Sequence, residues 1–137
     1  MKFIDLFAGL GGFHKALHEL GHECVFVSEL NSELRDIYYE NWKIKPYGDI
    51  RKVTSENINL IPEHDILCAG FPCQPFSKAG KQLGREDEGR GDLFDEIIKI
   101  LNYRKPKYFI LENVAFIAKH DEEKTWNYIK NELENKI

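Results

Sequence analysis

The sequence has few cysteines, no long apolar run and no excess of basic charge. Its three cysteines, Cys24, Cys68 and Cys73, are an odd number at no spacing typical of a zinc site, so we expect neither disulfides nor a bound metal. No apolar stretch approaches the roughly 18 residues of a membrane-spanning helix. The N-terminal stretch "MKFIDLFAGLGGF" has no signal-peptide cleavage site. We therefore expect a cytoplasmic protein that does not associate with a membrane.

The charge balance is mildly acidic, with a formal net charge of −4 at pH 7. A protein that binds nucleic acid through this chain alone would more often be basic, so the charge by itself favours a different partner. The chain has 137 residues, of which 42% are hydrophobic and 31% charged. These values predict one compact domain with a single sizeable core.

Short apolar segments alternate with segments of helical periodicity. Strands are expected at residues 1–7, 23–29, 64–70 and 107–113, and helices at 12–20, 31–42, 92–101 and 122–133. This alternation predicts an α/β fold, an open and mostly parallel sheet with helices on both faces. Such folds bind ligands at the carboxyl ends of their strands, and every distinctive stretch of the sequence falls at such an end.

A glycine-rich turn, "DLFAGLGG", joins the first strand to the first helix. Gly9, Gly11 and Gly12 permit a tight turn and a close approach of a ligand to the backbone. A dinucleotide fingerprint would place a third glycine at position 14, where this sequence has His14, and the turn has no lysine of the P-loop type. Both a nicotinamide cofactor and ATP are therefore disfavoured.

Two carboxylates follow at later strand ends. Glu29, 20 residues after Gly9, could accept hydrogen bonds from both ribose hydroxyls of an adenosine ligand, and Asp49 could meet the adenine edge. Either carboxylate alone would more often be a solvated surface acid. Together with the glycine turn, they favour a cofactor that contains adenosine.

Cys73 lies between two prolines in "FPCQPF", which restrict the backbone on both sides. A structural thiol is the interpretation for Cys24 and Cys68. A nucleobase deaminase is excluded, because Phe76 stands where its second cysteine would be. A nucleophile is the remaining interpretation, and Glu112 in "FILENV" is a candidate partner, although it could equally be an ion-pair partner.

The stretches "DLFAGLGGF", "GFPCQPFS" and "ENV", in this order, resemble the cytosine-C5 DNA methyltransferases, and the likeness to the bacterial modification enzymes of the HhaI type is close. The likeness also takes in "HDILCAGFPCQ", "GKQ" and "RGDLF" and runs along nearly the whole chain. It implies a Rossmann-like fold that uses S-adenosylmethionine.

The resemblance also implies a mechanism. Cys73 would add to carbon 6 of a cytosine flipped out of double-stranded DNA, while Glu112 would bind the N3 and amino edge. Carbon 5 would then take the methyl group of S-adenosylmethionine, and loss of its proton would expel the thiol.

By the same resemblance, further residues receive roles at the site. The cofactor-binding residues would be Phe7, Gly9, Leu10, Gly11, Glu29, Leu30, Asp49, Ile50, Pro72 and Leu93. The substrate-binding residues would be Gln74, Ser77, Asn113 and Val114. Leu30 departs from the family, which usually has a bulky aromatic residue there.

Members of the family continue well beyond this length. They add a target-recognition region and a C-terminal stretch that completes the cofactor pocket. We therefore expect residues 1–137 to be the N-terminal part of the catalytic domain of a DNA methyltransferase from a restriction-modification system. A second polypeptide that carries target recognition, a truncated gene product and an expressed fragment are all compatible with this length.

Two other functions remain open from the sequence. One is a transfer-RNA cytosine-C5 methyltransferase of the same lineage, which shares both motifs. The other is a cofactor-binding remnant without activity.

Overall fold

The computed structural model describes residues 1–72, 93–114, 118–119, 123–135 and 137. The chain divides into two compact units. The first contains residues 1–70 and 106–111, and the second contains residues 71–105 and 112–137.

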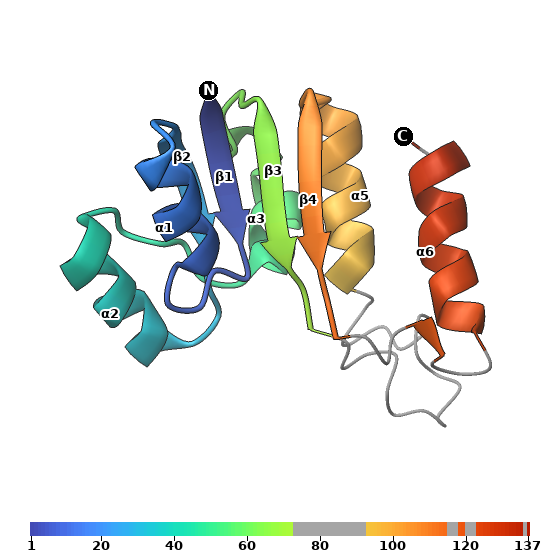
Figure 1. The fold of residues 1–137 in the computed structure, drawn as a ribbon, viewed down its shortest axis with the longest axis horizontal. Coiled ribbons are helices and arrows are strands. Elements are labelled where there is room, and N and C mark those ends of the chain that lie inside the picture. Colours follow the sequence, from blue (N-terminus) through green and yellow to red (C-terminus); the bar gives the residue numbers. More distant parts are fainter. Residues whose placement is uncertain (73–92, 115–117, 120–122, 136) are drawn as a thin grey trace. The chain divides into compact units, whose positions relative to one another are not determined.

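The first unit is built on a sheet with the strand order β2-β1-β3-β4. The strands comprise Lys2–Leu6 (β1), Glu23–Ser28 (β2), Ile66–Gly70 (β3) and Tyr108–Glu112 (β4). β1 pairs in parallel with both β2 and β3, and the arrows of β1, β3 and β4 point the same way in Figure 1. The prediction of a parallel sheet is confirmed. Because β1 lies between β2 and β3, the strand order reverses beside β1, which is where open α/β sheets bind ligands.

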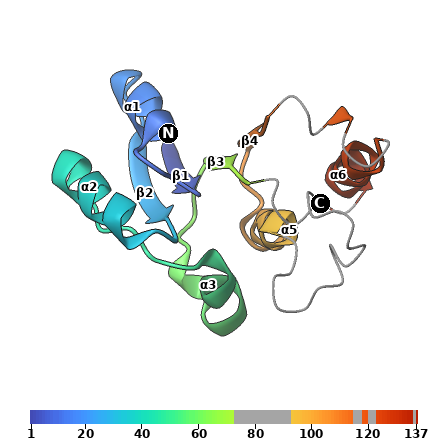
Figure 2. The same cartoon turned by 90° about the horizontal axis from the view of Figure 1, so that it is seen from below.

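Helices lie on both faces of this sheet. The first unit contains Gly12–Glu19 (α1), Ser32–Trp42 (α2), Ile50–Glu56 (α3) and the short 3-10 helix Ile58–Leu60 (η1). Figure 2 shows α1 on one side of the strands and α3 on the other. The predicted arrangement of helices on both faces is therefore confirmed.

Strands β1 and β3 are buried on both faces. Phe3, Ile66 and Cys68 form a cluster with Leu17 of α1. The neighbouring side chains along β1 and β3 point to the opposite face and are fully buried too, namely Ile4, Leu6 and Leu67. Burial on both faces explains why these strands read as continuous apolar runs in the sequence.

Helix α3 was not predicted from the sequence. It has only seven residues, and the stretch "IRKVTSE" lacks a sustained apolar period. Its N-cap, Asp49, accepts a hydrogen bond from the backbone N–H of Arg51 at 2.9 Å. This side-chain cap is the local signal for the start of the helix.

The second unit contains helices α5 (Leu93–Arg104) and α6 (Lys124–Asn135). The rings of Phe94 and Tyr128 meet edge to face, with centroids 6.0 Å apart. The Tyr128 hydroxyl also donates a hydrogen bond to Asp95. One aromatic residue of α6 thus contacts two consecutive residues of α5.

Within the residues that the structure describes, no helix combines the length and apolar character needed to cross a bilayer.

Candidate functional site

The turn between β1 and α1 contains three residues in the left-handed region. Phe7 has a φ of 56°, Gly9 of 57° and Gly11 of 93°. A side chain at positive φ costs about 1–2 kcal/mol, so Phe7 carries local strain where the strand ends. Strain of this kind is often found at functional sites.

Gly9 and Gly11, the two glycines of the turn with positive φ, are required for different reasons. A Cβ at Gly11 would lie 2.6 Å from Trp42 Nε1 and 3.0 Å from Tyr38 Cε2, so α2 occupies that space. A Cβ at Gly9 would meet nothing within 4 Å. Gly9 therefore presents open backbone that a ligand can approach closely.

A buried polar network lies beneath the turn. His14 Nδ1 is 2.7 Å from the Tyr38 hydroxyl, which donates to Asp5 Oδ2 at 3.1 Å. The His14 ring also stacks on Trp42 with a centroid distance of 4.0 Å. The residue that replaces the third glycine of a dinucleotide fingerprint thus packs α1 against α2. This finding accounts physically for the departure from the fingerprint.

Burial shifts the pKa values of Asp5 and His14, the two ends of this network, in opposite directions. Burial raises the pKa of Asp5 to about 7, although the hydrogen bond from Tyr38 opposes the shift. Burial, followed by the nearby charge of His18, lowers the pKa of His14 to about 4. Near neutral pH, His14 is therefore uncharged and Asp5 carries its proton for a large part of the time.

Glu29 follows β2 and is held directly against the glycine turn. Its Oε1 accepts the backbone N–H of Gly9 at 2.8 Å, and its Oε2 accepts that of Asn31 at 2.9 Å. Each carboxylate oxygen keeps a second lone pair that can accept a ligand hydroxyl. The structure thus brings Gly9 and Glu29 together, and the remaining lone pairs of the carboxylate fit the hydroxyl groups of a ribose.

Asp49 is brought towards the same strand end through Tyr47. The backbone N–H of Glu29 donates to the Tyr47 carbonyl at 2.9 Å, and that of Tyr47 donates to the Val27 carbonyl at 2.8 Å. The segment that precedes Asp49 therefore continues the sheet edge beside β2. As a result, both carboxylates predicted to bind the nucleoside belong to one backbone-bonded region.

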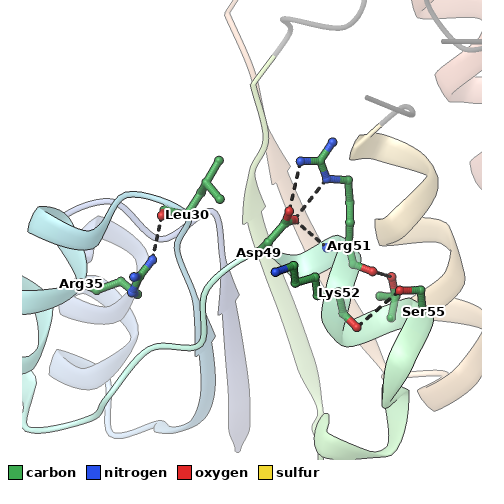
Figure 3. Close-up of polar contacts among 7 residues, drawn as sticks. Leu30, Arg35, Asp49, Arg51, Lys52 and Ser55 are labelled. Atoms are coloured by element: carbon green, nitrogen blue, oxygen red, sulfur yellow. Dashed lines mark hydrogen bonds and ion pairs between the residues drawn. The ribbon is translucent and has the colours of Figure 1, made fainter. Parts of the chain in front are cut away.

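The carboxylate of Asp49 is held by Arg51. Arg51 Nε lies 3.1 Å from Oδ1 and its terminal nitrogen lies 3.0 Å from Oδ2, as Figure 3 shows. Burial acts to raise the pKa of Asp49, but the hydrogen bonds and charge of Arg51 outweigh it and hold that pKa below its ordinary value. Asp49 is thus a fixed, ionised acceptor, which suits the predicted contact with an adenine amino group.

The other predicted cofactor residues of the first unit differ in exposure. Leu10 and Leu30 are 60% and 66% exposed, so their side chains are available to an apolar ligand surface. The side chain of Ile50 is only 4% exposed and belongs to the core. Any contact from Ile50 would therefore come from its backbone N–H, which as the first of α3 has no acceptor within the helix.

In the second unit, Asn113 joins two stretches of the predicted catalytic site. Its side-chain amide donates to the carbonyl of Phe71 at 2.8 Å, while its Oδ1 accepts the N–H of Val114 at 2.7 Å. Phe71 stands two residues before Cys73, and Asn113 directly follows Glu112, whose side chain is exposed. The contact therefore connects the backbone leading to Cys73 with the end of β4.

The remaining predicted residues lie in different parts of the chain. Pro72 and Leu93 are both partly buried, and Leu93 is the first residue of α5. The predicted nucleophile and two predicted substrate-binding residues lie outside the described residues, namely Cys73, Gln74 and Ser77. No group of three or more potential metal ligands occurs within the described part of the chain.

The two other cysteines have the properties of structural thiols. Cys68 is fully buried and Cys24 is partly buried, and neither forms a disulfide. Burial raises the pKa of each thiol to about 12. Neither thiol is ionised at neutral pH, so neither is suited to nucleophilic attack.

Comparison with known proteins identifies the family. Residues 1–136 match the model of the C-5 cytosine-specific DNA methylases. The chain belongs to this family. C-5 cytosine methylases use S-adenosylmethionine as their methyl donor, and the acceptors at Glu29 and Asp49 fit its adenosine half.

Two bacterial relatives resemble the chain closely. The type II methyltransferase M.HhaI of Haemophilus parahaemolyticus is 50% identical over 133 residues, which cover 97% of this chain and 39% of M.HhaI. M.MspI of Moraxella sp. is 45% identical over 134 residues, which cover 98% of this chain and 31% of M.MspI. The chain thus spans about a third to two fifths of the length of these two relatives.

A solved structure supports the fold. The Schizosaccharomyces pombe Dnmt2 methyltransferase matches with a TM-score of 0.72 at 23% identity, over 94% of this chain and 41% of that protein. The predicted methyltransferase fold is therefore confirmed.

Sequence reasoning missed several residues of the first unit that shape the site. Two of them are arginines that hold the Asp49 carboxylate or the backbone after β2, and the other three contact one another, so no motif marks them. These residues are His14, Arg35, Tyr38, Trp42 and Arg51.

Proposed function

We propose that this chain is the N-terminal catalytic part of a DNA (cytosine-5-)-methyltransferase. Its substrate would be a cytosine flipped out of double-stranded DNA, and its methyl donor S-adenosylmethionine. Membership of the C-5 cytosine-specific DNA methylase family supports the reaction. The relatives named type II methyltransferases support a place in a restriction-modification system.

The hydrogen bond between Gly9 and Glu29 carries the cofactor half of the proposal. It joins the open glycine backbone and the predicted ribose acceptor at one point. Glu29 would accept the ribose hydroxyls, and Asp49 would accept the adenine amino group. Phe7, Leu10 and Leu30 would supply apolar contacts within the first unit, and Pro72 and Leu93 remain predicted cofactor-binding residues of the second unit.

Cys73 and Glu112 would carry out the chemistry. The Cys73 thiolate would form a bond to carbon 6 of cytosine, which moves the π electrons of the 5,6 double bond to carbon 5. Glu112 would bind the N3 and amino edge and stabilise the ring during this addition. S-adenosylmethionine, when bound, supplies an electrophilic methyl group to carbon 5, and its sulfur keeps the electron pair of the broken S–CH3 bond and leaves as the thioether S-adenosylhomocysteine. Loss of the carbon 5 proton to a base would then restore the double bond and release the Cys73 thiolate.

The remaining predicted substrate contacts would surround this pair. Gln74 and Ser77 follow Cys73 in the chain and would contact the target cytosine or the sugar-phosphate backbone of the DNA. Val114 would do the same beside Glu112. Asn113 would hold the backbone that leads to Cys73, because its amide already donates to Phe71.

Target recognition would come from residues outside these 137, carried by a second polypeptide or by further chain. The net charge of −4 supports this division, since a region that reads DNA is usually basic. The share of M.HhaI that the match covers, 39%, leaves most of that relative without a counterpart here.

Calorimetric titration of the chain with S-adenosylmethionine tests the cofactor half. Glu29→Gln should weaken binding by about tenfold or more, because the amide cannot accept from both backbone N–H groups and the ribose. Asp49→Asn should weaken it similarly. Lys15→Gln, which removes an exposed charge on α1, is the control and should bind normally.

Transfer of a tritiated methyl group tests the reaction. The enzyme would be a hybrid in which residues 1–137 replace the matching part of M.HhaI. Methylation of duplex DNA, abolished by Cys73→Ser, is the expected result. Methylation of transfer RNA without methylation of DNA would contradict the proposal, as would activity that survives Cys73→Ser.

A further inference from the structure

Arg35 of α2 contacts the backbone that carries Glu29. One terminal nitrogen of its guanidinium donates to the carbonyl of Glu29 at 2.9 Å and to that of Leu30 at 2.7 Å. Figure 3 shows the second of these contacts. A single side chain thus holds two consecutive carbonyls at the end of β2.

The carboxylate of Glu29 also holds this segment in place. That carboxylate accepts the N–H groups of Gly9 and Asn31. The Asn31 side chain in turn caps α2 by accepting the N–H of Leu34 at 3.0 Å. Residues 29–31 are therefore held by hydrogen bonds at both carbonyls and at the acidic side chain.

Arg35 also lies against the segment that leads to Asp49. A Cβ at Gly48 would be 3.6 Å from the guanidinium nitrogen that bonds Glu29 and Leu30, and 4.0 Å from the guanidinium carbon. The guanidinium therefore lies between the peptide after Glu29 and the peptide before Asp49. These two segments are the ones proposed to hold the ribose and the adenine.

We propose that Arg35 is a positioning residue for the ribose of the methyl donor, an inference that rests on the proposed function. It fixes the plane of the Glu29–Leu30 peptide and the spacing of that peptide from Gly48. Without the guanidinium, the two carbonyls turn towards water, and the Glu29 carboxylate loses its fixed direction towards the ribose. Arg35 itself does not touch the ligand in this account.

The planar shape of the side chain is part of the inference. A guanidinium can donate to two carbonyls and still lie flat against a glycine backbone, whereas an ammonium is a compact point charge. Arg35→Lys should therefore retain part of the effect, and Arg35→Gln should lose most of it.

The test compares two ligands that differ only at the ribose. The 137-residue chain is titrated with S-adenosylhomocysteine and with its 2′-deoxy analogue. The wild-type chain should prefer the ribose form, and Arg35→Gln should reduce that preference by about tenfold, the size of a lost hydrogen bond to a charged group. Affinity for the deoxy form should change little. An equal loss for both ligands would show a merely structural role and overturn the inference.

A second measurement does not depend on ligand binding. In the ligand-free chain, the amide resonances of Gly9 and Asn31 report their hydrogen bonds to Glu29. Arg35→Gln should shift both resonances, while Lys15→Gln, which also removes one positive charge from the first unit, should leave them in place. Unchanged resonances in a folded Arg35→Gln variant would overturn the inference. If the wild-type chain binds neither ligand, the titrations are repeated with the hybrid that carries residues 1–137 in M.HhaI. A hybrid that binds neither ligand would count against the proposed function, and the resonances would then decide the role of Arg35 alone.

Discussion

The side-chain amide of Asn113 donates a hydrogen bond of 2.8 Å to the carbonyl of Phe71. This contact spans 42 positions of sequence and joins the end of β4 to the backbone that precedes Cys73. Asn113 thus has a positioning role of its own, because it holds the backbone that leads to Cys73.

Asn113→Asp should slow covalent capture of cytosine by Cys73 at least tenfold. The substitution keeps the size of the side chain but replaces the donor with a second acceptor, which faces the Phe71 carbonyl. Cofactor affinity should change much less, because Glu29 and Asp49, the proposed acceptors for adenosine, lie in the first unit. The rate of adduct formation with 5-fluorocytosine DNA measures the effect, and an unaltered rate would refute this role.

The three thiols should differ strongly in reactivity. Burial raises the pKa of Cys24 and Cys68 to about 12, so both should react slowly with iodoacetamide at pH 8. Cys73, as the proposed nucleophile, should react first. Peptide mass spectrometry after a short exposure identifies the labelled site. Rapid labelling of Cys68 in the folded chain would contradict this assignment.

Alanine at the two turn glycines should have contrasting effects. Gly11→Ala should lower the free energy of unfolding by more than about 2 kcal/mol, because the new methyl group meets Trp42 and the φ is positive. Gly9→Ala should cost only about 1–2 kcal/mol, from the φ alone. It should nevertheless weaken binding of S-adenosylmethionine, because the methyl group enters the open space. Urea denaturation and calorimetry measure the two effects, and equal destabilisation would contradict the packing account.

The network beneath the turn should give two opposing pH dependences. Asp5 has a raised pKa of about 7 against 3.8, so its contribution to stability is complete below about pH 4 and is lost as the pH rises towards 7. His14 has a lowered pKa of about 4 against 6.5, so its contribution is present above about pH 6.5 and is lost as the pH falls towards 4. Between about pH 4 and pH 6.5, the two opposite changes of unfolding free energy with pH therefore largely cancel.

Each variant should therefore reveal the slope of the other group. Asp5→Asn should become less stable as the pH falls from 6.5 to 4, and His14→Gln should become less stable as the pH rises over the same range. Each slope can reach about 1.4 kcal/mol per pH unit. Urea denaturation followed by Trp42 fluorescence, in a Trp126→Phe background, isolates the first unit. Variants whose unfolding free energy changes with pH as it does in the wild-type chain would contradict the two opposing pKa shifts.

Much of the fold could be predicted from local patterns. The apolar runs of β1 and β3 are visible because these strands are buried on both faces, and α1, α2, α5 and α6 have helical periodicity. Helix α3 escaped prediction because it has two turns and its only strong signal is the Asp49 cap. Its presence matters, since Ile50 then lies in the core rather than at the surface.

The parts of the site that could not be predicted depend on long-range packing. His14 was visible only as a missing glycine, and its contacts with Tyr38 and Trp42 arise when α1 meets α2. Arg35 acts on backbone carbonyls, which no sequence pattern marks. Glu29 could be predicted because a carboxylate at a strand end has a clear chemical use, and its contact with Gly9 agrees with that use.

Covalent trapping tests the central claim most directly. The hybrid that carries residues 1–137 is incubated with S-adenosylmethionine and duplex DNA containing 5-fluorocytosine, whose fluorine blocks the final elimination. The account predicts an adduct that survives denaturing electrophoresis and disappears in Cys73→Ser. A hybrid that binds S-adenosylmethionine but forms no adduct, or an adduct that persists in Cys73→Ser, would contradict it.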